Sequence, residues 1–135
     1  MDGVTLTPLK KISHPKGDIW HAMKKSDNGY CGFGEAYFST IKKDLIKGWK
    51  RHSVMTLNLV VPIGSIQVVV FNAQTKKHCS HTLHLENYKR LTIAPGLWVA
   101  FKGLSENSIL LNLANIEHDP NESQAKNISE IEYLW

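Results

Sequence analysis

One short segment of the 135-residue chain is the most informative about acid–base chemistry on a ligand. It runs from Ile46 to Asn58 and reads IKGWKRHSVMTLN. Histidine titrates near neutral pH, so His52 is the best candidate for a general acid or base. Lys50 would act as a base only if burial or neighbouring positive charge lowered its pKa by several units from the usual value of about 10.4.

The spacing within this segment separates polar from mostly apolar side chains, because alternate residues of an extended strand share a face. One face holds Gly48, Lys50, His52, Val54, Thr56 and Asn58, and the other holds Trp49, Arg51, Met55, Leu57 and Leu59. The polar row either meets bulk solvent or lines an enclosed space, where it would form a ligand pocket. The prediction of a site depends on the second orientation.

The elements that must position this segment are predicted to be strands. Ser53–Ile63 and Ser65–Asn72 are rich in β-branched residues and are separated by a turn at Pro62-Ile63-Gly64. Further strands bounded by turn residues are expected at Cys31–Thr40, His81–Leu85, Tyr88–Ile93, Leu97–Phe101 and Ser108–Asn115. Helix is expected only as one turn at Ile41–Lys47 and as a short element at Glu122–Ile131. This pattern predicts an all-β fold, a double-sheet jelly roll, in a single domain spanning residues 1–135.

Composition excludes several classes of protein. The longest apolar run, Leu59–Ile63, is too short to cross a bilayer, and the N-terminal residues lack the apolar stretch of a secretory signal. The two cysteines, Cys31 and Cys79, are expected to be reduced thiols in a cytoplasmic protein. The net charge of +4 is modest and no nucleic-acid-binding module is visible, so the basic residues better fit a small anion such as a phosphate or a sugar diphosphate.

Three pieces of the sequence resemble the sugar-nucleotide cupins in order and spacing: Ile46–His52 (IKGWKRH), Pro62–Gly64 (PIG) and Leu91–Trp98 (LTIAPGLW). This family comprises the dTDP-4-dehydrorhamnose 3,5-epimerases and the related dTDP-4-keto-6-deoxyhexose 3,4-ketoisomerases. The resemblance implies a jelly-roll cupin, usually a homodimer. It further implies action on a nucleotide-linked 4-keto-6-deoxy sugar, dTDP-linked in these relatives, without a metal or organic cofactor.

The resemblance also assigns roles to individual residues. The epimerases carry an Arg-Gly-x-His element whose arginine contacts the diphosphate and whose histidine is the general base, and Lys47 and Lys50 stand at these two positions. His52 stands where the ketoisomerases have a second histidine. Tyr37 lies near their active-site tyrosine, where a hydroxyl could donate a proton to a developing enolate. These residues predict catalysis by His52, Lys50 and Tyr37, with Lys47 on the diphosphate.

Further substrate contacts are expected from Lys16, which replaces an arginine of the epimerases, and from Arg51, Asn58 and Trp98. Trp98 either stacks on a nucleobase or sugar or is a core residue. The supporting carboxylate of the epimerases is expected to have no counterpart. The lysine at the position of the base therefore keeps an alternative open: a non-catalytic sugar-nucleotide-binding or assembly protein with the same fold.

A metal site is not expected. Metal-binding cupins need two histidines one residue apart, a glutamate and a third histidine, and only His52 matches this set. The run from His78 to His84 (HCSHTLH) holds further ligand-type residues, but a strand would direct them to opposite faces.

Overall fold

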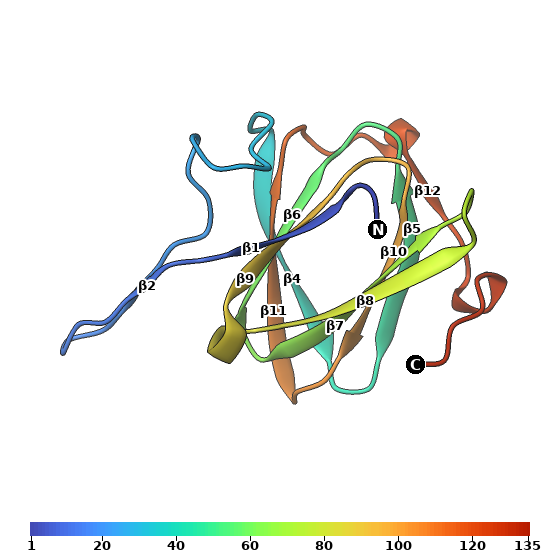
Figure 1. Ribbon diagram of the computed structural model, residues 1–135. Coiled ribbons are helices and arrows are strands. Elements are labelled where there is room, and N and C mark those ends of the chain that lie inside the picture. The colour runs from blue at the N-terminus through green and yellow to red at the C-terminus, as the bar shows by residue number, and fades with distance from the viewer.

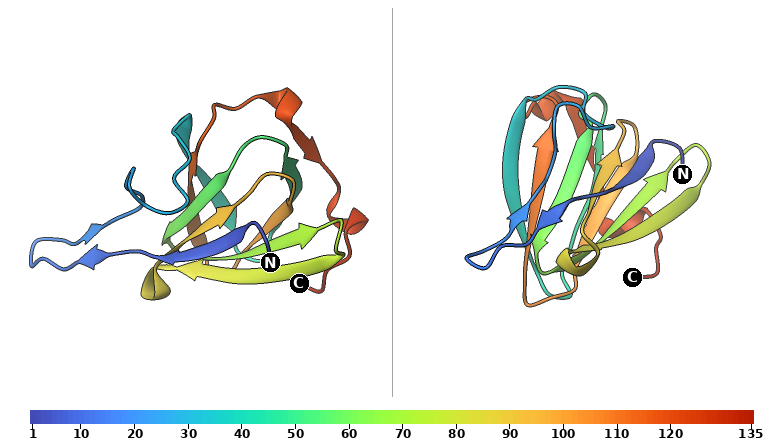
Figure 2. Two further views of the ribbon diagram at one scale, coloured as in Figure 1. Left: turned by 45° about the horizontal axis from the view of Figure 1, so that its top comes forward. Right: turned by 60° about the vertical axis from the view of Figure 1, so that its left-hand side comes forward.

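The computed structural model describes residues 1–135 and consists of two five-stranded antiparallel sheets packed face to face (Figure 1, Figure 2). In the first sheet the strand order is β1 (Val4–Pro8), β9 (Lys89–Ile93), β6 (Leu57–Ile63), β11 (Asn107–Ala114) and β4 (Glu35–Lys42). In the second it is β12 (Ser123–Ala125), β5 (Ile46–His52), β10 (Trp98–Gly103), β7 (Ser65–Asn72) and β8 (Lys77–His84). The all-β jelly roll predicted from the sequence is confirmed.

The main core lies between the sheets and contains fifteen buried hydrophobic residues. Strand β7 shows how the sequence builds it: Ile66, Val68 and Val70 recur at every second position and face the core. Because burial of apolar area is the dominant favourable contribution to folding, this alternating β-branched pattern fixes which face of the strand turns inward.

A second apolar cluster covers the outer face of the second sheet. It consists of Trp49, Val69, Trp98, Ala100 and Ile131. The C-terminal segment crosses this face after the 3₁₀ turn η3 (Ile128–Glu130), and the Trp49 indole donates a hydrogen bond to the carbonyl of Ile128 at 3.3 Å. The second sheet is therefore covered on both faces.

Both predicted helices are wrong. In the first segment β4 continues to Lys42, and a turn with Asp44 at φ 64° leads directly into β5. In the second, the 3₁₀ turn η2 (Pro120–Glu122) is followed by β12, which pairs with β5, so backbone pairing replaces the expected helix. The third 3₁₀ turn, η1, spans Leu85–Asn87.

A two-stranded arm extends away from the body of the molecule (Figure 1). It is formed by β2 (Lys11–Ile12) and β3 (Ile19–Trp20), and every residue from Lys10 to Trp20 is exposed. The structure has no helix with the length and apolar character that crossing a bilayer requires.

Candidate active site

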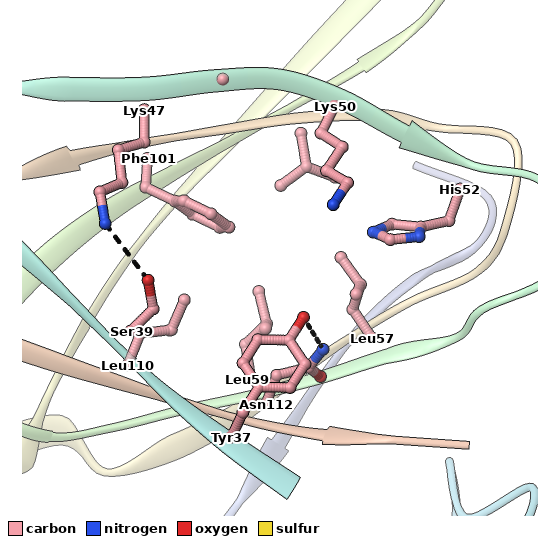
Figure 3. A pocket seen from close by; sticks show the side chains of 12 residues that line it. Tyr37, Ser39, Lys47, Lys50, His52, Leu57, Leu59, Phe101, Leu110 and Asn112 are labelled. Carbon is pink, nitrogen blue, oxygen red and sulfur yellow. Dashed lines mark hydrogen bonds between the residues drawn. The ribbon is translucent and has the colours of Figure 1, made fainter. Parts of the chain in front are cut away.

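A cavity of about 300 Å³ lies between the two sheets, toward the end where β4 and β5 form its walls (Figure 3). Strands β6, β10 and β11 supply its largely apolar lining, namely Leu57, Leu59, Val99, Phe101 and Leu110. Six polar side chains face the same space: Tyr37, Ser39, Lys47, Lys50, His52 and Asn112. An apolar hollow with a few converging polar groups is the usual form of a small-molecule site.

Strand β5 presents its predicted polar face to this cavity. Gly48, Lys50 and His52 line the hollow, whereas Trp49 is buried in the outer cluster. A side chain at residue 48 would not fit, because its Cβ would lie 2.5 Å from the Cβ of Ala100 on β10. The inward orientation on which the predicted site depended is thus present for Lys50 and His52 (Figure 3).

His52 is 6% exposed and is held by a buried carboxylate. Its Nδ1 is hydrogen-bonded to Oε1 of Glu122, which lies at the end of η2, directly before the strand that pairs with β5. The other carboxylate oxygen of Glu122 accepts hydrogen bonds from the backbone N–H groups of Val54 and Met55, each at 3.1 Å. With Nδ1 occupied in this way, Nε2 is the ring nitrogen directed into the cavity (Figure 3).

The surroundings of Glu122 favour its charged form. Burial alone would raise the pKa of this carboxyl group, but the hydrogen bonds from His52, Met55 and Val54 outweigh that effect and hold the pKa below its usual value. A carboxylate that accepts a hydrogen bond from Nδ1–H fixes the imidazole tautomer and stabilises the imidazolium that forms when Nε2 takes a proton. The pair therefore has the arrangement of an oriented general base.

The two lysines of the cavity differ in their partners. The Lys47 ammonium donates to the backbone carbonyl of Thr40 at 2.6 Å and lies 3.4 Å from the Ser39 hydroxyl. Lys50 takes part in none of the ion pairs of the structure, and its ammonium points into the cavity next to His52 (Figure 3). Lys50 is therefore available to a ligand.

Tyr37 faces His52 and Lys50 from the opposite wall of the cavity (Figure 3). Its hydroxyl oxygen accepts a hydrogen bond of 2.9 Å from the side-chain amide of Asn112, a residue that is 2% exposed. A base on one wall and a hydroxyl on the other can act on the two sides of a bound molecule.

A comparison with known protein families assigns the chain to one of them. The sequence model described as "FdtA: WxcM-like, C-terminal" matches residues 2–130. The chain belongs to this WxcM-like family. No curated protein matches its sequence.

Solved structures place the WxcM-like chain among sugar-nucleotide cupins. A dTDP sugar isomerase from Desulfovibrio desulfuricans G20 is 29% identical, with a TM-score of 0.93 over 99% of this chain and 91% of that one. A mutant of the 3,4-ketoisomerase QdtA from Thermoanaerobacterium thermosaccharolyticum, in complex with TDP-4-keto-6-deoxyglucose, is 22% identical, with a TM-score of 0.81 over 92% and 88%. A dTDP-4-dehydrorhamnose 3,5-epimerase from Sulfolobus tokodaii is 21% identical, with a TM-score of 0.86 over 98% and 82%. The predicted resemblance is confirmed.

Asn58 does not line the cavity of the WxcM-like chain, although the sequence placed it on the same face as His52. Strand β5 ends at His52 and β6 begins only at Leu57. The intervening loop reverses the alternation, so Leu57 and Leu59 face the cavity. Asn58 instead donates to the backbone carbonyl of Gly29 at 3.1 Å and holds a loop on the outside of the first sheet.

Three other predicted contacts also lie outside the cavity. Trp98 packs in the outer cluster, and the Arg51 guanidinium lies 5.0 Å from the centre of its ring. Arg51 also donates a hydrogen bond to Gln124 of β12. Lys16 lies between β2 and β3 in the exposed arm. The cavity therefore brings together Tyr37, Lys47, Lys50 and His52, and separates them from Lys16, Arg51, Asn58 and Trp98.

Two site residues were missed at the level of sequence. Glu122 provides a carboxylate beside His52 that was not predicted from the sequence. The feature of the sequence that could have indicated Glu122 is the proline-containing run from Glu117 to Glu122 (EHDPNE), which predicts a turn and is followed by residues compatible with a strand. Asn112 had only its polar character within the apolar strand β11 to distinguish it.

The structure contains no group of three or more His, Cys, Asp or Glu side chains that could hold a metal ion. Cys31 and Cys79 form no disulfide.

Proposed function

We propose that the protein is a cofactor-independent epimerase or isomerase of a nucleotide-linked 4-keto-6-deoxy sugar in deoxysugar or polysaccharide biosynthesis. The observation that supports this proposal most directly is the His52–Glu122 pair directed into a cavity that also holds an unpaired lysine. The 29% identity to a dTDP sugar isomerase over nearly the whole chain agrees with it.

The reaction begins at the carbon beside the ketone. The carbonyl group acidifies the adjacent C–H bond, and Nε2 of His52 takes that proton as the general base. Glu122 stabilises the imidazolium. The negative charge that develops on the carbonyl oxygen is met by the ammonium of Lys50 and the hydroxyl of Tyr37, which face the same space. Return of a proton to a different carbon, or to the other side of the same carbon, gives the isomer.

The dimensions of the cavity determine which part of the substrate enters it. At about 300 Å³, the cavity lies at the small end of the range for ligand pockets, about 300–1,000 Å³. It has room for the sugar ring, so the diphosphate and nucleoside lie at its mouth. Lys47 has a third N–H beyond those directed at Thr40 and Ser39, and it contacts the diphosphate through that donor.

Hydrogen exchange at the sugar tests this function. The protein is incubated with dTDP-4-keto-6-deoxyglucose in heavy water, and loss of the C3 and C5 proton signals is followed by NMR. Exchange is expected with the wild-type protein and is expected to disappear in His52→Ala. It should persist in His118→Ala, which removes an exposed histidine outside the cavity.

The alternative is a binding or assembly protein that retains the fold without the chemistry. The observation that favours it is Lys50, which occupies the cavity position where the resemblance leads one to expect the catalytic histidine. Binding of dTDP-4-keto-6-deoxyglucose measured by calorimetry, without exchange at C3 or C5, would support this alternative and contradict the enzymatic proposal.

We also propose that the protein is a homodimer. The arm exposes Ile12, Ile19 and Trp20, which have no covering element in the single chain. Because Lys16 lies in this arm and does not line the cavity of its own chain, its predicted contact with the diphosphate would be made in the cavity of a second copy. Light scattering should show a dimer for the wild-type protein and a monomer for Trp20→Lys; a monomeric wild-type protein would contradict the proposal.

A further inference from the structure

The amide group of Asn112 can have only one orientation in the core. Its side-chain oxygen accepts a hydrogen bond of 3.1 Å from the backbone N–H of Asn58. A backbone N–H only donates, so the oxygen of the amide must lie on that side. The NH₂ group is then directed at Tyr37, 2.9 Å from its hydroxyl oxygen, with the sulfur of Met55 at 3.8 Å as its other neighbour.

This orientation determines what the Tyr37 hydroxyl can do. An NH₂ group has no lone pair to offer, so Tyr37 is the acceptor of the bond with Asn112 and its own O–H proton must be directed elsewhere. The hydroxyl makes no second hydrogen bond within the protein. Tyr37 is 38% exposed and lines the cavity, so its proton is available to a ligand there (Figure 3).

We propose that Asn112 is a positioning residue that makes Tyr37 a hydrogen-bond and proton donor to the substrate. This inference rests on the proposed isomerase function and assigns a direction to one step of it. Tyr37 donates its O–H proton to the oxygen of the enolate formed by His52, and the phenolate oxygen that remains keeps the hydrogen bond from the Asn112 amide. The cycle closes when the His52 imidazolium, whose proton has exchanged with water, returns a proton to carbon and the enol O–H returns its proton to the Tyr37 phenolate, so that both groups recover their starting states.

Asn112→Asp reverses the hydrogen bond at almost constant shape. One carboxylate oxygen still accepts from Asn58 N–H, but the other replaces the NH₂ group and accepts the Tyr37 proton, which is then lost to the cavity. Exchange at the sugar carbons should fall as far as it does in Tyr37→Phe, about 10²–10⁴-fold, the usual contribution of a general acid. The double variant Tyr37→Phe/Asn112→Asp should show no further loss.

Asn112→Leu provides the matched comparison. It leaves the Asn58 N–H unpaired and should lower the melting temperature, but it leaves the Tyr37 proton free to reach the substrate. The proposal therefore expects a smaller loss of exchange in Asn112→Leu than in Asn112→Asp. A purely structural role for Asn112 predicts the opposite order. Exchange in Asn112→Asp at the wild-type rate, or a loss in Asn112→Leu that equals or exceeds it, would overturn the inference.

A second measurement requires neither catalysis nor a folded Asn112 variant. In a ¹⁵N-labelled protein, Tyr37→Phe removes the acceptor of the Asn112 amide, so the side-chain NH₂ resonances of Asn112 should shift. Unchanged resonances would refute the assigned bond. If the wild-type protein exchanges no sugar hydrogen while these resonances do shift, the proposed function fails and the assigned hydrogen-bond direction stands.

Discussion

Replacing Glu122 with glutamine tests whether this carboxylate determines the proton arrangement of His52. One oxygen of Glu122 accepts two backbone N–H groups. Only the carbonyl oxygen of a glutamine can take over these bonds, so its NH₂ group would be directed at Nδ1 of His52. Nδ1 would then become an acceptor, and the ring proton would move to Nε2. His52 would present a proton instead of a lone pair to the substrate.

The size of this effect follows from the geometry. The corresponding carboxylate-to-amide change in the serine protease triad lowers kcat about 10⁴-fold because the histidine adopts the wrong tautomer. The His52–Glu122 pair is similarly buried and similarly bonded. We therefore expect hydrogen exchange at C3 and C5 of the sugar to fall about 10²–10⁴-fold in Glu122→Gln.

The assay compares Glu122→Gln with Glu117→Gln, which changes an exposed carboxylate in the same loop. NMR exchange in heavy water gives the rate, and the ¹⁵N shifts of His52 identify the protonated ring nitrogen. Exchange in Glu122→Gln at the wild-type rate would refute the reasoning, as would a His52 ring that keeps its proton on Nδ1.

Three further predictions follow from the structure. Burial would raise the pKa of Glu122, but its hydrogen bonds lower the pKa overall. The ionised carboxylate therefore stabilises the fold at pH values above its ordinary pKa of 4.5, and this contribution is lost as the pH falls through the lower pKa of the folded state. Urea midpoints measured below pH 4.5 should decrease more steeply for the wild type than for Glu122→Gln, and parallel curves would contradict this. Lys50→Met should lower hydrogen exchange at the sugar carbons about 10²–10³-fold. The melting temperature should change little, because the ammonium has no ion-pair partner to lose. Unchanged exchange would exclude Lys50 from the reaction. Arg90 is fully buried and donates to the carbonyls of Ala22 and Asn28 at 2.7 and 2.9 Å. Arg90→Met should therefore lower the free energy of unfolding in urea by about 1–3 kcal/mol and expose this loop to proteolysis, whereas wild-type stability would show that the loop does not depend on Arg90.

The alternation of inward-facing and outward-facing side chains that builds the sheets can be recognised in the sequence, because it depends only on residues that are neighbours along the strand. It predicted most strands and the inward face of β5, which carries Lys50 and His52. It failed where the alternation was extended across the loop after His52, since a loop does not preserve the phase of a strand. Asn58 was therefore placed on the wrong face.

The partner of His52 could not be found by local reasoning. Glu122 is 70 residues away in sequence and reaches the histidine because β12 pairs antiparallel with β5, with Ser123 opposite His52. No periodicity within either segment reports that pairing. The prediction of a helix at Glu122–Ile131 failed for the same reason. These residues are compatible with a helix, and only pairing with the edge of a distant strand makes the extended form more favourable.

Strand β5 divides its side chains between two compartments, with Trp49 in the outer cluster and Lys50 and His52 in the cavity. Requirements for folding and for chemistry therefore fall on alternate positions of the same strand. A combinatorial library that varies residues 50 and 52 and retains Trp49 would sample new reactivities on an unchanged scaffold.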